Sequence, residues 1–263
     1  MAVRLYTSRE VELIRKAGLL AFEAHMVVKK MITPGVTTLE LSHAALNYIT
    51  SKKGKAAFLG FSGFPEAICT SVNDIVVHGI PNKLTVLKEG DIIGVDIGTE
   101  VDGYFADTAW TWGVGNISDE NKRLLSVTAK SLYKGIKEAV ATNRIGAIGA
   151  SIQEFVESNK YSVVRSLVGH GVGKSVHEEP QIPNFGKRKN GIQIKNGMVL
   201  AIEPMVNCGV YDVYTGDDKW SVKTKDGKNS AHFEHTIAVT ANGPSICTLP
   251  KDLDEKKAMD LIN

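Results

Sequence analysis

The sequence has few cysteines, no long apolar run and almost no net charge, and each of these absences excludes a class of protein. Cys69, Cys208 and Cys247 are the only cysteines among 263 residues, which argues against a disulfide-rich secreted domain and suits a reducing compartment. No segment approaches the roughly 18 apolar residues that a membrane-spanning helix needs. The N-terminal segment MAVRLYTSREVELIRK lacks the apolar stretch of a secretory signal, so we expect a cytoplasmic protein without membrane contact.

The charge is nearly balanced, with 31 Lys and Arg against 29 Asp and Glu and a formal net charge of +2. Such a balance predicts no specific nucleic-acid partner. The short basic run Lys187-Arg188-Lys189 is typical of a solvated loop, and contact with ribosomal RNA is the alternative. Because 43% of the residues are hydrophobic, the chain can bury a large core without disulfides.

Helix signals occur in two pairs. Threonine–glutamate capping boxes at residues 7–10 and 37–40 open helices that we expect to reach about residues 31 and 52. Two more helices are predicted over residues 118–141 and 146–159.

Strand-like segments follow each pair of predicted helices. They lie at residues 67–77 (two short strands), 91–99, 104–112, 198–205, 219–224 and 232–240, and a weak strand at 162–168 precedes a loop rich in Gly and His. This order predicts an α+β fold with helices packed on a mainly antiparallel sheet. We expect a single domain over residues 1–263, with two similar halves of roughly residues 1–117 and 118–263.

Two aspartates, Asp96 and Asp107, flank a predicted hairpin turn at Asp102-Gly103. The midpoint of their numbers falls at this turn, so we expect them to face each other on one side of the sheet. Opposed residues have Cβ atoms about 4.5–5.5 Å apart, and two carboxylates that close need a cation or a shared proton. The alternative is that one of them sits at a bulge and faces solvent.

Three further residues have the chemistry of metal ligands. His170 lies between glycines, Glu203 ends an apolar strand and Glu234 begins another. Each alone has an ordinary explanation as a strand-end or packing residue. Four carboxylates and one imidazole together suit Mn, Fe(II) or Co better than a closed zinc site, and they carry enough charge for two ions.

These residues, in this order, resemble the methionine aminopeptidase family, type I. The segments that carry the resemblance are Cys69-Thr70-Ser71-Val72-Asn73, His78-Gly79-Ile80-Pro81, Asp96, Asp107-Thr108, Gly169 to Pro180, Glu203-Pro204 and Glu234-His235-Thr236. The resemblance covers nearly the whole chain and implies the short bacterial or organellar form, with the pita-bread fold of two pseudo-symmetric halves. The short interval between His170 and Glu203 leaves no room for the insertion of type II enzymes.

The resemblance also implies a ligand set for two divalent ions, Mn, Fe(II) or Co, with Zn as a further option. Asp107, His170, Glu203 and Glu234 would hold the first ion, and Asp96, Asp107 and Glu234 the second.

The implied reaction removes the N-terminal methionine from nascent proteins and peptides when the second residue is small. Glu203 would be the general base for a metal-bridging water, and His177 would stabilise the oxyanion. His78 would hydrogen-bond near the scissile nitrogen and help to protonate the leaving amine. We expect a monomer that acts on peptide and nascent-protein N-termini, with ribosome contact left open.

The family's methionine pocket corresponds to an apolar, partly aromatic set: Phe58, Phe61, Phe64, Cys69, Val176 and Trp220, with His78 and His177 at its inner end. Without the resemblance, ordinary core packing would explain the same residues. Phe58, Phe61, Phe64 and Val176 depart from the usual family residues, which leaves the shape of the pocket open.

Rival interpretations fail on particular residues. A phosphate-binding loop at Gly173-Lys174-Ser175 would need a glycine where Val168 stands, and His177-Glu178-Glu179-Pro180 is not the H-E-x-x-H of other metallopeptidases. Two alternatives within the fold stay open: a catalytically inactive relative and a proline-directed peptidase.

Overall fold

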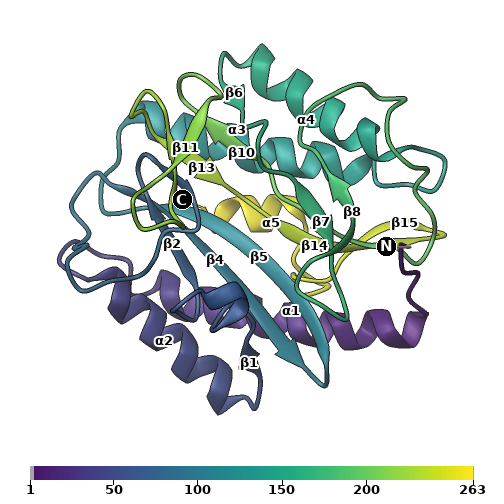
Figure 1. Cartoon of the computed structure of the whole chain (residues 1–263), viewed down its shortest axis with the longest axis horizontal. Helices are drawn as coiled ribbons and strands as arrows, with labels where there is room; N and C mark the ends of the chain where they lie inside the picture. Colours follow the sequence, from purple (N-terminus) through teal and green to yellow (C-terminus); the bar gives the residue numbers. More distant parts are fainter. Residues whose placement is uncertain (1–2, 263) are drawn as a thin grey trace.

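The computed structural model describes residues 3–262 and has helices on two sides of a set of strands (Figure 1). The helices are α1 (Ser8–Lys29), α2 (Thr38–Ser51), the short 3-10 helix η1 (Phe61–Gly63), α3 (Asp119–Lys137), α4 (Ile145–Ser158) and α5 (Glu255–Asp260). Helices α1 and α2 lie at the bottom of Figure 1, α3 and α4 lie at the top, and the strands run between them. Within residues 3–262, no helix is both long and apolar enough to cross a membrane.

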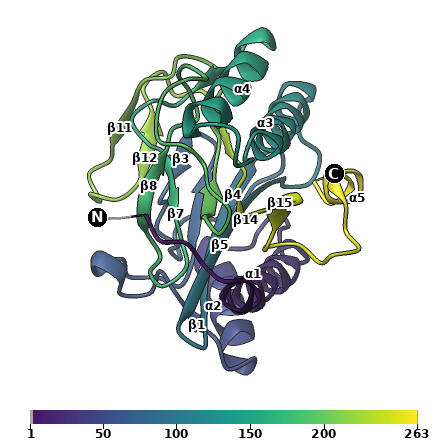
Figure 2. The same ribbon diagram turned by 90° about the vertical axis from the view of Figure 1, so that its right-hand side faces the viewer.

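The strands pair antiparallel throughout the described residues, as expected, and form four sheets. They are β1 (Lys55–Ala56), β2 (Cys69–Val72), β3 (Ile75–Val77), β4 (Ile92–Val101), β5 (Tyr104–Gly113), β6 (Ser162–Val163), β7 (Gly169–Gly171), β8 (Glu178–Ile182), β9 (Val199–Ile202), β10 (Met205–Asn207), β11 (Val213–Thr215), β12 (Val222–Thr224), β13 (Ser230–His232), β14 (His235–Thr240) and β15 (Gly243–Ile246). The largest sheet has the order β15-β14-β9-β7-β8. Figure 2 shows β4 and β5 between α1 and α3.

The four predicted long helices are confirmed, and so are the capping signals of the first two. Both capping boxes form, because the Thr7 and Thr37 side chains accept from the Glu10 and Glu40 amides and the glutamates bond back. Helix α1 ends at Lys29 and α3 at Lys137, a few residues before the predicted ends. End positions are the least determined part of such predictions.

The β4–β5 hairpin turns at Asp102-Gly103 as predicted, but the predicted pairing of Asp96 with Asp107 is wrong. Both turn residues have positive φ, 54° and 75°, which matches a two-residue turn. This turn pairs Val101 with Tyr104, so Asp96 lies opposite Ala109 and Asp107 lies opposite Gly98. The two aspartates are therefore diagonal neighbours on one face, shifted by two residues from direct opposition.

Two predicted strands are each broken at a glutamate. The predicted strand 198–205 contains β9 and only the first residue of β10, which lie on either side of Glu203-Pro204. The predicted strand 232–240 contains the last residue of β13 and all of β14, which lie on either side of Phe233-Glu234. In each case the chain passes from one sheet to another, since β9 and β14 belong to the five-stranded sheet and β10 and β13 to a three-stranded sheet. The Glu203 and Glu234 side chains are therefore placed at the points where the chain passes from one sheet to the other.

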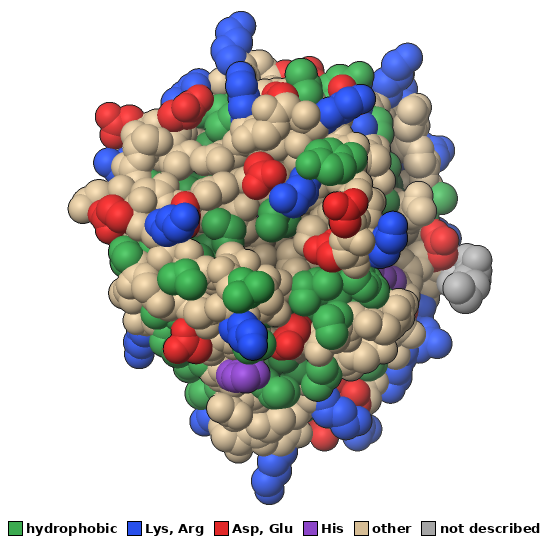
Figure 3. Space-filling model, turned by 60° about the vertical axis from the view of Figure 1, so that its left-hand side comes forward, with side chains coloured by type: hydrophobic (Ala, Val, Ile, Leu, Met, Phe, Trp, Pro, Cys, Tyr) green, Lys and Arg blue, Asp and Glu red, His purple; other side chains and the backbone are tan. Residues whose placement is uncertain are grey.

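The predicted loop rich in Gly and His contains strands β7 and β8, whereas the weak strand at 162–168 is reduced to Ser162–Val163. The surface agrees with the balanced composition: on the face in Figure 3, side chains of both charges are interspersed.

Candidate active site

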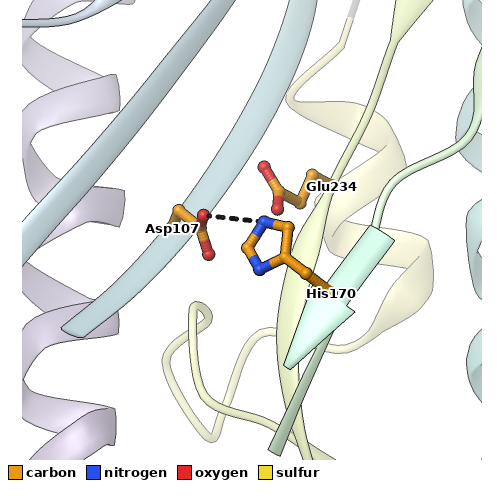
Figure 4. A group of neighbouring side chains, drawn as sticks. All are labelled: Asp107, His170 and Glu234. Atoms are coloured by element: carbon orange, nitrogen blue, oxygen red, sulfur yellow. Dashed lines mark ion pairs between the residues drawn. The ribbon is translucent and has the colours of Figure 1, made fainter. Parts of the chain in front are cut away.

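Three predicted ligands, Asp107, His170 and Glu234, converge at one point (Figure 4). Asp107 comes from β5, His170 from β7 and Glu234 from the junction between β13 and β14. One ligand atom of each lies within 4.8 Å of the others, and His170 Nε2 is 3.5 Å from Asp107 Oδ2. Their spacing and donor types suit a divalent cation.

The other two predicted ligands, Asp96 and Glu203, line the same pocket. Glu203 Oε1 is 3.4 Å from His170 Nε2, so this carboxylate lies directly beside the cluster. Asp96 Oδ1 is buried and has no hydrogen-bond partner among the described residues, which fits an oxygen that awaits a cation.

The backbone around the cluster is held by hydrogen bonds between β5 and the β13–β14 junction. Thr108 Oγ1 donates to the Glu234 carbonyl at 2.6 Å, and the Glu234 amide donates to the Ala109 carbonyl at 2.9 Å. Thr236 Oγ1 donates to the Asp107 carbonyl oxygen at 2.9 Å. These bonds fix the two carboxylates relative to each other before any ion binds.

The tautomer of His170 follows from its neighbour. Nδ1 lies 2.9 Å from the Gly171 carbonyl, which can only accept, so Nδ1 carries the proton. The lone pair of Nε2 therefore faces Asp107 and Glu203. Burial lowers the pKa of His170 to about 4, which keeps the ring neutral, as a metal ligand must be.

Burial acts on the carboxylates in the opposite direction. It raises the pKa of Asp107 to about 6, although His177 and the Thr236 hydroxyl oppose the shift. Burial and the neighbouring carboxylates raise the pKa values of Asp96, Glu203 and Glu234 well above their usual range. Four acids in one apolar site cannot all ionise without a compensating charge, so the donor set fits a divalent metal.

Two further histidines line the pocket beside the cluster. The ring of His177 lies 4.2 Å from that of His170 and meets the ring of Phe61 edge-on at 5.2 Å. Burial, and then the neighbouring rings of His177 and His170, lower the pKa of His78 to about 4. Burial also lowers the pKa of His177, so both rings are neutral hydrogen-bonding groups near pH 7.

The residues predicted for the methionine pocket lie at a cavity of about 600 Å³ that the predicted metal ligands also line. All predicted substrate-binding residues except Val176 line it: Phe58, Phe61, Phe64, Cys69, His78, His177 and Trp220. Val176 belongs to the same apolar cluster, in which Phe58, Phe64 and Cys69 are buried.

The aromatic side chains of this pocket differ in their degree of burial. Phe64 meets Trp220 edge-on at 5.2 Å, whereas Phe61 is 38% exposed and lies at the rim. A Cβ on Gly98 would come within 2.6 Å of the Phe58 ring, so this glycine makes room for Phe58 beside β4.

Sequence reasoning missed His232, which is buried behind Glu203. Its Nε2 lies 3.6 Å from Glu203 Oε2, too far for a hydrogen bond, and has no other partner among the described residues. In the sequence, the only indication of a role for His232 is its position two residues before Glu234. It became informative once β10 and β13 were seen to pair Met205 with His232.

The profile of metallopeptidase family M24 matches residues 12–241. The chain therefore belongs to metallopeptidase family M24. It is 51% identical to methionine aminopeptidase 1 of Bacillus subtilis, with 92% of this chain and 97% of that protein covered. It is 48% identical to the methionine aminopeptidase of Clostridium perfringens, over 94% of this chain and 99% of the other. Within family M24, the chain belongs to the methionine aminopeptidases.

Solved structures agree with this assignment. The methionine aminopeptidase of Thermotoga maritima superposes with a TM-score of 0.93 at 43% identity, covering 95% of this chain and all of the other. The prolidase of Pyrococcus horikoshii, at 19% identity and a TM-score of 0.73, shares the fold alone. The pita-bread fold implied by the resemblance is thus confirmed.

Proposed function

We propose that the protein hydrolyses the bond after an N-terminal methionine, and that the second residue must be small. The observation that carries the proposal is the position of the Asp107–His170–Glu234 cluster in the same pocket as the predicted methionine-binding residues. An apolar cavity that ends in a charged cluster suits a substrate with an apolar side chain and a polar reacting bond.

We propose two divalent ions, Mn, Fe(II) or Co with Zn as an option. Asp107 and Glu234 would be shared between the ions, His170 and Glu203 would complete one site, and Asp96 the other. The raised carboxyl pKa values and the unpartnered Asp96 Oδ1 support this assignment. When bound, the ions supply Lewis-acid chemistry that polarises the scissile carbonyl and makes water more acidic.

The protein's own side chains would move the protons. Glu203 would take a proton from the attacking water, because it is a buried carboxylate beside the cluster whose pKa burial and the neighbouring carboxylates raise well above its usual range. His177, which is neutral and lies beside the His170 ring, would donate a hydrogen bond to the developing oxyanion. His78 would hydrogen-bond near the scissile nitrogen.

The methionine side chain would lie among Phe58, Phe64, Cys69, Val176 and Trp220. Flexible thioethers pack well against aromatic rings, which favours methionine over a branched residue here. Phe61, at the exposed rim, would contact the substrate from outside.

The remaining partners and the setting are part of the same proposal. We propose that the protein acts as a monomer in the cytoplasm, on the N-termini of peptides and nascent chains. Its three cysteines are free thiols, which supports a reducing compartment. The division into halves at residues 117 and 118 remains a prediction.

The proposal is tested by a peptidase assay on metal-stripped protein titrated with Mn, Fe(II), Co and Zn. Met-Ala-Ser should be hydrolysed in a metal-dependent manner, whereas Met-Leu-Ser and an Ala-Pro dipeptide should be poor substrates. Preferred cleavage of Ala-Pro would instead make the protein a proline-directed peptidase, and no cleavage with any metal would refute catalysis.

His177→Ala should lower kcat for Met-Ala-Ser by about 10²-fold, because one hydrogen-bond donor to the transition state is lost. Since His177 is outside the predicted ligand set, metal content measured by elemental analysis should not change. A large loss of bound metal would make His177 a ligand and contradict its assigned role.

A further inference from the structure

The N-terminal segment that precedes α1 lies against the loop between β7 and β8, residues 172–177, which we call the β7–β8 loop. Figure 2 shows this segment passing beside β7 and β8 before it enters α1. Tyr6 is 6% exposed, and its amide donates to the Gly197 carbonyl at 2.7 Å. A Cβ on Gly173 would come within 2.3 Å of the Tyr6 hydroxyl oxygen, so the tyrosine is in direct contact with the loop backbone.

The Tyr6 hydroxyl is both a hydrogen-bond donor and a hydrogen-bond acceptor in this contact. It donates to Glu178 Oε2 at 2.7 Å and accepts from the Lys174 amide at 2.8 Å. Glu178 Oε1 accepts from the Lys174 and Ser175 amides at 2.8 and 3.1 Å. The loop therefore folds around the Glu178 carboxylate. Tyr6, which belongs neither to the loop nor to its flanking strands, orients this carboxylate.

A second contact holds the other side of the loop. The Phe105 amide donates to the Gly173 carbonyl at 2.7 Å, and Lys174 Nζ lies 3.5 Å from the centre of the Tyr104 ring. The β4–β5 hairpin thus holds the loop from one direction and Tyr6 from the other. Val176 and His177 are the last two residues of the loop, so the position of the loop sets the place of His177 in the pocket and of Val176 in the apolar cluster beside it.

We propose that Tyr6 is a positioning residue, which holds the β7–β8 loop through Glu178 and the Lys174 amide so that His177 and Val176 stay aligned with the substrate. The proposal rests on the proposed function only for its activity readout. A displacement of about 1 Å in a group that contacts the transition state can lower a rate by about 10²-fold, so even a modest release of the loop is measurable. Burial and the Glu178 carboxylate raise the pKa of Tyr6, so the hydroxyl keeps its proton at neutral pH.

The test is Tyr6→Phe, which removes the hydroxyl and keeps the ring in contact with Gly173. Two hydrogen bonds are lost, one of them to a carboxylate, so kcat for Met-Ala-Ser should fall about 5- to 20-fold, and KM should change less. Independently of activity, amide hydrogen exchange across residues 172–177 should become about tenfold faster, because the Lys174 and Ser175 amides lose a fixed acceptor. This second readout is measured on the metal-free protein.

The chain offers a matched control in Tyr48, whose hydroxyl donates to Glu23 Oε2 at 2.9 Å between α2 and α1, away from the pocket. Tyr48→Phe removes the same kind of hydrogen bond and should leave kcat and the exchange of residues 172–177 unchanged. Glu178→Gln should reproduce part of the Tyr6→Phe effect, and the double variant should lose less than the sum of the two, because Tyr6 and Glu178 are hydrogen-bonded to each other and share the Lys174 amide.

Loop exchange equal to that of the wild type in Tyr6→Phe would overturn the proposal, whatever the activity. Additive losses in the double variant would also overturn it, since Tyr6 would then act by another route. The Tm of each variant is measured alongside, because a large fall in Tm would indicate general destabilisation and not a local release of the loop. Absence of peptidase activity in the wild type would instead refute the proposed function and leave the exchange experiment interpretable.

Discussion

Glu203→Ala should lower kcat for Met-Ala-Ser by about 10³-fold or more, the largest single effect that we expect in this protein. The reason is that Glu203 is placed beside the cluster, with Oε1 3.4 Å from His170 Nε2, where it can take the proton of an attacking water. A loss of this size corresponds to about 4 kcal/mol of transition-state stabilisation. Single-turnover and steady-state assays at saturating metal measure it.

Glu203→Gln separates the two roles assigned to this residue. The amide keeps the shape and one oxygen donor but cannot accept a proton at neutral pH, so metal content should largely persist while turnover is lost. Glu120→Gln is the control, because this exposed carboxylate on α3 lies outside the cavity and should change turnover less than about threefold. A Glu203→Gln variant that kept most of its activity would remove Glu203 from the role of base.

The parts of the site that could be predicted from the sequence are those encoded by local signals. Capping residues predicted the starts of α1 and α2, and an Asp-Gly pair predicted the β4–β5 turn. The pairing across that turn was wrong by two residues, because the midpoint of Asp96 and Asp107 is not the centre of a two-residue turn. A shift of two preserves the face, so both carboxylates still point into the pocket.

The breaks at Glu203 and Glu234 were harder to predict. Each lies within an apolar run that reads as one strand, and only the sheet pairings show that the chain changes sheets there. In Glu203-Pro204 the proline, which lacks an N–H for the ladder, was a usable signal. Phe233-Glu234 offers no comparable signal, and its break follows from the Glu234 amide bonding across to Ala109.

Contacts between distant parts of the chain that neither a motif nor the resemblance implies could not be predicted. Tyr6 and Glu178 are 172 positions apart, and the sequence gives no reason to pair them. His232 lies next to Glu203 only because β10 and β13 are neighbours. Such contacts depend on the packing of whole elements, for which a single sequence without structure carries no periodic or motif signal.

The metal-free protein should become less stable as the pH rises from 7 to 8, and a saturating divalent cation should abolish this dependence. Burial and the neighbouring carboxylates raise the pKa values of Asp96, Glu203 and Glu234 well above their usual range, so above that range the folded chain holds protons that the unfolded chain has released. Stability falls with rising pH wherever the folded state binds more protons. Each retained proton lowers the free energy of unfolding by about 1.4 kcal/mol per pH unit, or about 3–6 °C in Tm.

The buried histidines oppose this trend mainly below pH 7. Burial lowers the pKa values of His170 and His78 to about 4 and those of His25, His232 and His235 to about 3. Their contribution rises with pH and is largely in place by pH 7, because histidines of the unfolded chain are half titrated near pH 6.5. Asp107, at about 6, has also largely titrated by pH 7. The pH range of the comparison ends at 8. Above it the buried cysteines, which have raised pKa values, begin to lower the stability with rising pH as the carboxylates do.

Thermal unfolding of chelator-treated protein at pH 7.0, 7.5 and 8.0, with and without Mn, measures this slope. Asp96→Asn should flatten it in the metal-free protein, since one of the retained protons is removed, whereas Asp252→Asn at an exposed position should not. A metal-free protein whose Tm is constant or rises over this interval would mean that the carboxylates are already ionised or compensated by other groups. In that case the crowding of acids would no longer support a site built for two cations, because the electrostatic cost that binding relieves would be absent.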